Sequence, residues 1–204
     1  MARANARISA VMLAAGKSAR MGEPKQLLRL NGRTVLEQTL ENVRASGVDE
    51  VVLVLGASAE KIRGELRGEL FDGLKVAVNQ NYAQGMASSL RVGLATASPQ
   101  MDAALVVLAD QPFVRPETMQ QIIKRYRRSD AEIVIPFYEG KRGNPVLLDR
   151  SVFPDAMALE GDIGFRALFG KHTAGIVEMN VADEGVLLDI DSREDYERLR
   201  SREG

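Results

Sequence analysis

A short apolar run that leads directly into a loop of small residues constrains the fold of this chain more than any other feature. Residues Ile8 to Leu13 carry no charge, and Ala14, Ala15 and Gly16 follow them. Such a run is typical of a strand that is buried on both faces, as in a parallel sheet. The loop therefore begins at the carboxyl end of a strand, where open α/β sheets bind their ligands.

The rest of the chain alternates between apolar runs and helical patterns, which predicts a doubly wound sheet. We expect strands at 51–55, 74–78, 103–109, 132–136, 175–179 and 186–188, and a strand at 145–148 that is antiparallel. Helices are expected to follow Thr34 and to cover 60–70, 86–94, 116–128, 159–169 and 193–202. We predict a three-layer α/β/α fold of Rossmann-like type, with a mostly parallel mixed sheet in a single domain over residues 1–204.

Composition narrows the range of partners. The chain has 27 basic and 28 acidic residues and no long basic run, which disfavours nucleic acid and anionic membranes and favours a small-molecule ligand. It contains no cysteine, which removes disulfides and thiolate chemistry. The first apolar run is too short for a signal peptide, and none approaches the roughly twenty residues of a membrane helix. We expect a cytoplasmic protein.

The loop has the composition of a phosphate-binding site. Small residues allow close approach of the backbone to a ligand, and successive N–H groups in such a turn can bind an anion. Arg20 and Lys25 add the positive charge that a triphosphate requires. The loop is not a P-loop, because Val11 stands where the first glycine is needed, and Gly16 and Gly22 are too few glycines for a dinucleotide fingerprint.

The segment from Leu13 to Leu28 resembles the signature Leu-Ala-Ala-Gly-x-Ser-x-Arg-Met-Gly-x-x-Lys-x-Leu-Leu of MobA-like nucleotidyltransferases, and within them of the molybdenum cofactor cytidylyltransferases (MocA-type). The resemblance implies a fold of nucleotide-diphospho-sugar transferase type and transfer of CMP from CTP to molybdopterin with Mg²⁺. It also implies a molybdoenzyme of the xanthine dehydrogenase type as the recipient of the product. In this family Leu-Ala-Ala-Gly accompanies cytidine transfer, and Leu-Ala-Gly-Gly accompanies guanosine transfer.

Two carboxylates are candidates for the metal. Asp110 ends a central apolar strand and so faces the ligand crevice, and Mg²⁺ takes one or two carboxylates together with phosphate oxygens. The segment from Leu188 to Asp195 resembles the closing motif Asp-Ile-Asp-Thr-x-Glu-Asp of the family, from which we choose Asp191 over Asp189. Helix capping is the plain alternative for both sites.

The remaining candidates follow from the same resemblance. The nucleotide would contact Leu13, Ala14, Ala15, Gly16, Arg20, Lys25, Asn79 and Ser89, and catalysis would use Arg20, Lys25 and Asp110. The acceptor would contact Arg142, Asn144, Asp162 and Arg166, on two glycine-bearing segments. His172, the single histidine, has no second ligand nearby in the sequence and is predicted to be a surface residue.

Three other functions stay open at this point. A sugar-phosphate or polyol-phosphate cytidylyltransferase would use the same nucleotide half, as would a guanylyltransferase of the same fold. A carrier or chaperone of the finished molybdenum cofactor is the non-enzymatic alternative. A carrier, however, has no use for a triphosphate loop together with a metal-binding aspartate.

Overall fold

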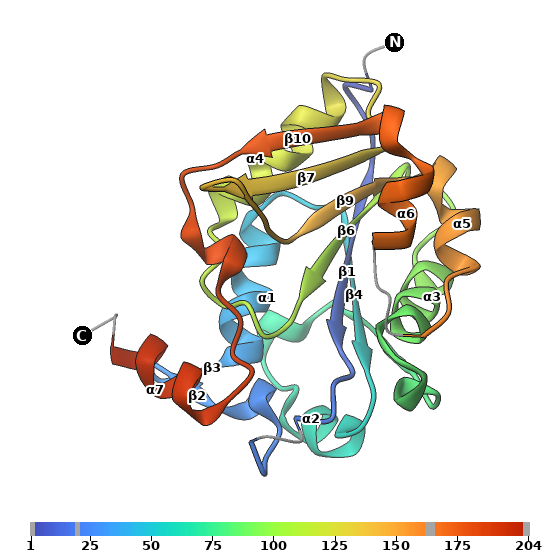
Figure 1. Cartoon of the computed structure of the whole chain (residues 1–204). Helices are drawn as coiled ribbons and strands as arrows, with labels where there is room; N and C mark the ends of the chain where they lie inside the picture. Colours follow the sequence, from blue (N-terminus) through green and yellow to red (C-terminus); the bar gives the residue numbers. More distant parts are fainter. Residues whose placement is uncertain (1–2, 19–20, 162–165, 202–204) are drawn as a thin grey trace.

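A mostly parallel sheet lies at the centre of the computed structural model, which describes residues 3–18, 21–161 and 166–201 (Figure 1). Its strands follow the order β10-β7-β9-β6-β1-β4-β5, and β8 pairs with β7. The bounds are β1 (Ile8–Ala14), β4 (Glu50–Leu55), β5 (Lys75–Val78), β6 (Ala103–Leu108), β7 (Ile133–Tyr138), β8 (Lys141–Arg142), β9 (Val146–Asp149) and β10 (Ile176–Asn180). Strand β9 runs antiparallel to both β6 and β7, as predicted for this segment.

Helices cover both faces of the sheet, which confirms the three-layer prediction (Figure 1). Side chains of β1 alternate between two apolar cores, with Ile8, Ala10 and Met12 in one and Val11 and Leu13 in the other. The first core includes α1 (Val35–Ala45), α2 (Ala59–Glu65) and α4 (Pro116–Arg127), and the second includes α3 (Met86–Thr96), α5 (Phe153–Met157) and α6 (Arg166–Lys171). Within the described ranges, no helix is long and apolar enough to cross a membrane.

Helix α3 approaches the sheet very closely because Gly93 has no side chain. A Cβ atom at this position would lie 2.2 Å from Cγ1 of Val11 and 3.1 Å from Cγ2 of Val54. Real atoms do not approach so closely, so any larger residue would push the helix away from β1 and β4. The glycine thereby sets the position of the whole helix, including the N-terminal turn near the ligand edge of the sheet.

Some sequence-based boundaries are wrong. Residues 186–188 were predicted as a strand, but 186 and 187 belong to a 3-10 helix at Glu184–Leu187 and 188 follows it, and the helix expected over 60–70 ends at Glu65. The helix expected within 159–169 overlaps α6 at its C-terminal end, residues 162–165 lie outside the described part of the chain, and α5 was not predicted. A hairpin of β2 (Arg29–Leu30) and β3 (Arg33–Thr34) was also missed. The Asn31-Gly32 pair was a sequence signal for this hairpin, because tight hairpin turns require positive φ angles and favour these residue types. Both residues do adopt positive φ angles in the structure.

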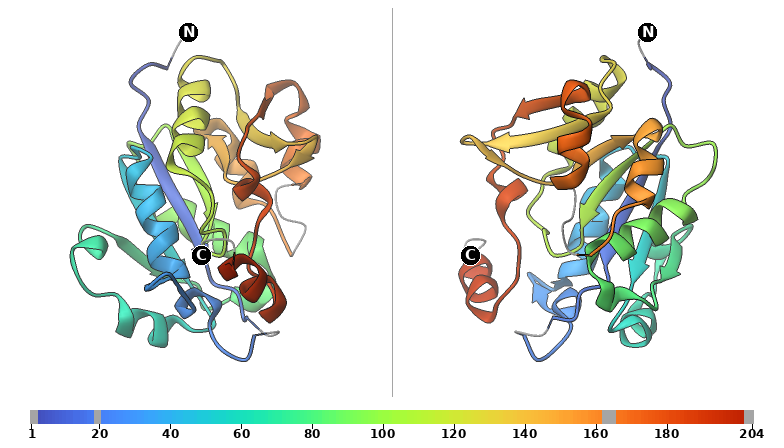
Figure 2. Two further views of the ribbon diagram at one scale, coloured as in Figure 1. Left: turned by 90° about the vertical axis from the view of Figure 1, so that its left-hand side faces the viewer. Right: turned by 45° about the vertical axis from the view of Figure 1, so that its right-hand side comes forward.

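The C-terminal helix α7 (Arg193–Arg200) packs on this hairpin, as both views in Figure 2 show. Tyr196 and Leu199 are buried against Leu28, Leu30 and Val35, and the Tyr196 hydroxyl donates to the carbonyl of Arg29 at 2.6 Å. So short a helix is not stable alone, and burial of two such side chains contributes about 1.5–3 kcal/mol each. This packing fixes the segment that precedes α7 beside the ligand edge of the sheet.

His172 joins three elements far from that edge. Its Nδ1 lies 2.7 Å from Oε2 of Glu132, and its Nε2 lies 2.9 Å from Oδ2 of Asp155, which also pairs with Lys171. Both ring nitrogens can donate only in the protonated imidazolium. The hydrogen bond to Glu132 is the main cause that raises the pKa of His172, although partial burial opposes it. The side chain is 12% exposed, so His172 lies at the surface but is half-buried by its ion pairs.

The His172 ion pairs predict a pH-dependent contribution to stability. Because the pKa is raised in the folded protein, the contribution is complete below the ordinary value of 6.5 and is lost as the pH rises through the folded value. We expect His172→Gln to lower the melting temperature more at pH about 6 than at pH about 9. Thermal melts of both proteins across this range measure the difference, and a pH-independent difference would contradict the assignment.

Candidate functional site

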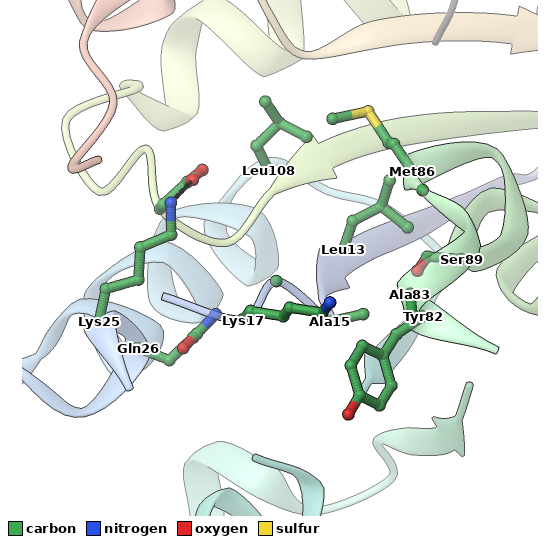
Figure 3. A pocket seen from close by; sticks show the side chains of 13 residues that line it. Leu13, Ala15, Lys17, Lys25, Gln26, Tyr82, Ala83, Met86, Ser89 and Leu108 are labelled. Carbon is green, nitrogen blue, oxygen red and sulfur yellow. Dashed lines mark hydrogen bonds and ion pairs between the residues drawn. The ribbon is translucent and has the colours of Figure 1, made fainter. Parts of the chain in front are cut away.

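A pocket of about 390 Å³ opens at the carboxyl ends of β1 and β6 (Figure 3). The phosphate loop supplies one wall, the start of α3 supplies another, and the end of β6 closes the third side. The lining residues are Leu13, Ala15, Gly16, Lys17, Lys25, Gln26, Tyr82, Ala83, Gly85, Met86, Ser89, Leu108 and Asp110. The structure thus brings most of the predicted nucleotide residues to one cavity.

The phosphate loop presents open hydrogen-bond donors. Gly16 and Lys17 are exposed at the pocket, and their N–H groups bond to no other described residue. Ser18 adopts a positive φ of 49°, which reverses the chain, and its Oγ accepts the N–H of Lys25 at 3.1 Å. Consecutive free N–H groups in a turn form a concave anion site. The geometry therefore supports the predicted phosphate contact of this loop.

Lys25 lies between two carboxylates. Its Nζ donates to Oδ2 of Asp110 and, at 2.8 Å, to Oδ1 of Asp191. The lysine is only 9% exposed. Burial lowers the pKa of its ammonium, but the charge and hydrogen bond of Asp110 and those of Asp191 outweigh this effect and hold the pKa above its usual range. Lys25 is therefore a buried cation that joins the end of β6 to the segment before α7.

Two local interactions place Asp191 at this position. The N–H of Ile190 donates to the carbonyl of Asp110 at 3.0 Å, which aligns the two segments. The next residue, Ser192, caps α7 through a reciprocal capping box with Asp195. Capping thus falls to Ser192, and the Asp191 carboxylate points to Lys25. Desolvation and the charges of Asp191 and Asp110 raise the pKa of the neighbouring Asp189, which lies within electrostatic reach of both.

The residues at this cluster fit a divalent cation that is also bound by a ligand's phosphates. Oδ1 of Asp110 is buried and has no hydrogen-bond partner among the described residues. The same part of the chain holds no group of three or more His, Cys, Asp or Glu side chains that could bind a metal alone. Mg²⁺ characteristically takes one or two carboxylates and completes its shell with phosphate and water oxygens. The Asp110 and Asp191 carboxylates meet that requirement.

The opposite end of the pocket is lined by the turn that starts α3. Asn79 is buried and donates through Nδ2 to Oγ of Ser88 at 2.8 Å and to Oγ of Ser89 at 3.0 Å. Its Oδ1 accepts the N–H of Asn81 at 2.9 Å. Both N–H bonds of the Asn79 side-chain amide are therefore used in orienting the two serines. Because the Ser89 hydroxyl accepts from Asn79, its own proton is free to point into the pocket.

Ala15 sits where the loops after β1 and β4 touch. A Cβ atom on Gly56 would lie 2.6 Å from the carbonyl oxygen of Ala15 and 2.7 Å from its Cβ. The Ala15 methyl group thus packs against bare backbone and also lines the pocket. The methyl group therefore contributes to the shape of the pocket.

Two of the predicted acceptor residues, Arg142 and Asn144, do not line the pocket. The guanidinium of Arg142 stacks over the ring of Phe169 at 4.4 Å and lies 6.0 Å from that of Phe137. Asn144 is half-buried, and its N–H donates to the carbonyl of Val186 at 3.0 Å. Arg20 and Asp162 lie outside the described residues, as does the side chain of Arg166, the first residue of α6.

Sequence reasoning missed several residues that line the pocket. Gln26 is 2% exposed, and its Oε1 is buried with no hydrogen-bond partner among the described residues. Tyr82 and Leu108 also line the pocket, and Figure 3 shows the Tyr82 side chain on the same side of the pocket as Ser89. Gln26 follows the loop lysine and Leu108 ends the strand before Asp110, so their positions in the sequence indicated that they lie near the site. Tyr82 belongs to a polar turn, and nothing in the sequence indicated that it lines the pocket.

A mostly parallel sheet with a phosphate loop after its first strand, facing a buried lysine and two aspartates, defines a nucleotide-binding protein of nucleotide-diphospho-sugar transferase fold. Residues 10–176 match the family model described as the MobA-like NTP transferase domain. The chain therefore belongs to this family of nucleotidyltransferases.

Individual proteins extend the comparison. Nicotine blue oxidoreductase of Paenarthrobacter nicotinovorans is 31% identical over 201 residues, or 94% of this chain and 96% of that protein. The crystal structure of Rv0371c from Mycobacterium tuberculosis H37Rv matches with a TM-score of 0.84 and 36% identity over 96% of this chain and 98% of that one. Rv0371c has also been solved in complex with manganese. A nucleotidyl transferase from Methanothermobacter matches with a TM-score of 0.81 and 28% identity, covering 96% and 97% of the two chains.

Proposed function

We propose that this protein transfers CMP from CTP to the terminal phosphate of molybdopterin, which releases pyrophosphate and forms molybdopterin cytosine dinucleotide. The observation that carries the proposal is the cluster of Lys25, Asp110 and Asp191 facing the open N–H groups of the phosphate loop. The pocket is suited to a triphosphate at the end formed by the phosphate loop and Lys25, and to a nucleoside at the end formed by the start of α3. The Leu-Ala-Ala-Gly sequence of the loop supports cytidine as that nucleoside.

The chain's own residues would divide the work along the pocket. The N–H groups of Gly16 and Lys17 bind the triphosphate, with Arg20 and Lys25 adding positive charge to the leaving pyrophosphate. Ser89, whose proton is directed by Asn79, donates to an oxygen of the nucleoside. Asp110 and Asp191 would hold Mg²⁺. When bound there, Mg²⁺ supplies charge neutralisation and orients the phosphates for displacement.

The transfer requires no general base. A phosphate monoester is largely ionised at neutral pH, so an acceptor phosphate oxygen can attack the α-phosphorus directly. The bond from the α-phosphorus to its bridging oxygen breaks, and pyrophosphate leaves with the electron pair. Catalysis then depends on positioning and charge stabilisation, as in other phosphoryl-type transfers. This agrees with a pocket whose lining contains no histidine among the described residues.

The test is pyrophosphate release with each of CTP, GTP, ATP and UTP in turn, with Mg²⁺, and with and without molybdopterin. We expect release with CTP that depends on molybdopterin. Release with a sugar phosphate or polyol phosphate instead would assign the acceptor differently and leave the nucleotide half intact. Absence of release with every acceptor, combined with tight binding of the finished cofactor, would favour the carrier function.

Nucleotide choice gives a specific prediction. We expect CTP to exceed GTP by at least about tenfold in kcat/KM, and Ala15→Gly to narrow this ratio without reversing it. A difference of one methyl group in a pocket changes the binding free energy by only about 1–3 kcal/mol. Hydrogen bonds such as that of Ser89 must therefore provide the remaining preference for CTP. Equal kcat/KM for both nucleotides in the wild-type protein would exclude the cytidylyltransferase assignment.

Arg142 tests the acceptor side. A guanidinium stacked on a ring uses its face, so the N–H groups on its edge stay available to an anion. We expect Arg142→Ala to raise the KM for molybdopterin about tenfold and to leave the Kd for CTP within about twofold. Arg142→Lys keeps the charge without the fork and should lie between the two. An equal loss of CTP affinity in a direct titration would contradict the assignment of Arg142 to the acceptor.

A redox function is the alternative that the relative from Paenarthrobacter raises. The chain has only Gly16 and Gly22 in the region where a dinucleotide fingerprint needs three glycines, which disfavours a nicotinamide dinucleotide at the same loop. Nicotine blue with NADH or NADPH is the direct control, followed by loss of absorbance of the reduced nucleotide. Consumption of the nucleotide in that assay, without pyrophosphate release from CTP, would replace the transferase proposal.

A further inference from the structure

A lysine ammonium stands where a divalent cation would bind. Nζ of Lys25 contacts Oδ2 of Asp110 and lies 2.8 Å from Oδ1 of Asp191, so it pairs with the same two carboxylates that would hold Mg²⁺. The Asp110 side chain is only 17% exposed. Two carboxylates this close to each other repel strongly unless a cation lies between them. Lys25 provides that cation within the chain itself.

The backbone of Lys25 is held in place, whereas its side chain is flexible enough for the ammonium to move away from the two aspartates. Its backbone is fixed in a 3-10 helix at Lys25–Leu27, after Pro24, and by the hydrogen bond from its N–H to Ser18. The side chain beyond this point is a flexible four-carbon stem. It lines the same pocket as Gly16 and Lys17, so a ligand on the loop would share the pocket with this flexible stem (Figure 3).

We propose that Lys25 is a resident substitute for the metal, which blocks the Asp110 and Asp191 site against a free divalent cation until a nucleotide triphosphate accepts the lysine. This inference rests on the proposed nucleotide and metal sites and adds the order in which they fill. A free cation must displace an ammonium that then has no anionic partner. A metal–triphosphate complex avoids that penalty, since its phosphates offer Lys25 a new partner in the same step.

The exchange leaves neither Lys25 nor the two aspartates without a partner of opposite charge. Before it, one ammonium faces two carboxylates; after it, the carboxylates face the divalent cation and the ammonium faces phosphate oxygens. The consequence is a metal site with low affinity for metal alone and high affinity for the metal–nucleotide complex. Binding of the two is then coupled through one side chain, which is a concrete two-state element.

The test is titration of the whole protein with Mn²⁺ alone, with free Mn²⁺ measured by electron paramagnetic resonance. We expect Lys25→Met to bind Mn²⁺ at least about tenfold more tightly than the wild-type protein, because removal of the ammonium exposes two carboxylates to the metal. Lys25→Gln keeps a polar stem end and should shift the affinity in the same direction. Lys25→Gln therefore tests the same change in Mn²⁺ affinity if the methionine variant folds poorly.

Lys17→Met is the matched control, since it removes one positive charge from the same pocket without touching either aspartate. Its Mn²⁺ affinity should stay within about twofold of the wild type. The double variant Lys25→Met with Asp110→Asn should lose the increase in Mn²⁺ affinity that Lys25→Met alone produces. The inference is wrong if Lys25 variants bind Mn²⁺ no more tightly than the wild type, or if Lys17→Met gains as much. Because no nucleotide is present, that failure would leave the transferase proposal standing.

Discussion

Asp110→Asn is expected to lower kcat by about a hundredfold or more under saturating CTP and Mg²⁺, which corresponds to a loss of about 2.7 kcal/mol of transition-state stabilisation. Asp110 lies two residues beyond the end of β6, and its Oδ1 is buried with no hydrogen-bond partner among the described residues. The asparagine keeps the shape of the side chain but cannot supply the charge that the metal needs. The charge matters most in the transition state, in which negative charge is transferred to the pyrophosphate.

Two further variants separate this explanation from a general loss of structure. Asp191→Asn should lower kcat by a similar factor, because Asp191 and Asp110 both form an ion pair with Lys25. Asp189→Asn should cost less than about fivefold, because Asp189 makes no ion pair with Lys25 and affects the cluster only through its charge. Steady-state pyrophosphate release measures all three, with circular dichroism to check folding. A larger loss for Asp189 than for Asp191 would make Asp189 the second metal ligand.

The sequence predicted most of the sheet because its strands are long apolar runs with little ambiguity. Strand β1 is buried along its whole length, and β9 was recognised as antiparallel from the break in the alternation of strands and helices. The errors lie in short elements, whose formation depends on contacts with distant residues. Residues 186–188 are apolar enough for a strand, yet Val186 packs against Gly143 within a 3-10 helix. Only the tertiary structure shows that contact.

The site was predicted less evenly. The resemblance located Lys25, Asp110 and Asp191, but it assigned the lysine to the phosphates and the aspartates to the metal as separate groups. Their mutual ion pairs depend on α7 packing against the β2–β3 hairpin, an element that was missed. Asn79 was expected to contact the nucleotide, and its amide bonds to Ser88, Ser89 and Asn81 could not be predicted. Hydrogen-bond partners within a site do not follow from the residue types alone.

Lys25→Met is expected to lower kcat by about a hundredfold as well, although the same variant binds free Mn²⁺ more tightly. In the proposed reaction Lys25 leaves the aspartates and stabilises charge on the pyrophosphate, so its loss removes an interaction that strengthens in the transition state. The Lys25→Arg variant keeps a positive charge on a bulkier, planar group and should recover only part of the rate. Single-turnover CMP transfer with saturating CTP separates this effect from weaker nucleotide binding.

The two readouts for Lys25 move in opposite directions, and this makes the role of the residue testable. A variant that had merely lost its fold would lose both Mn²⁺ binding and turnover. A lysine that served only as a structural ion pair at Asp110 would leave the single-turnover rate nearly intact once the protein was folded and saturated. Tighter metal binding combined with about hundredfold slower transfer fits only a lysine that occupies the metal site first and the phosphates afterwards.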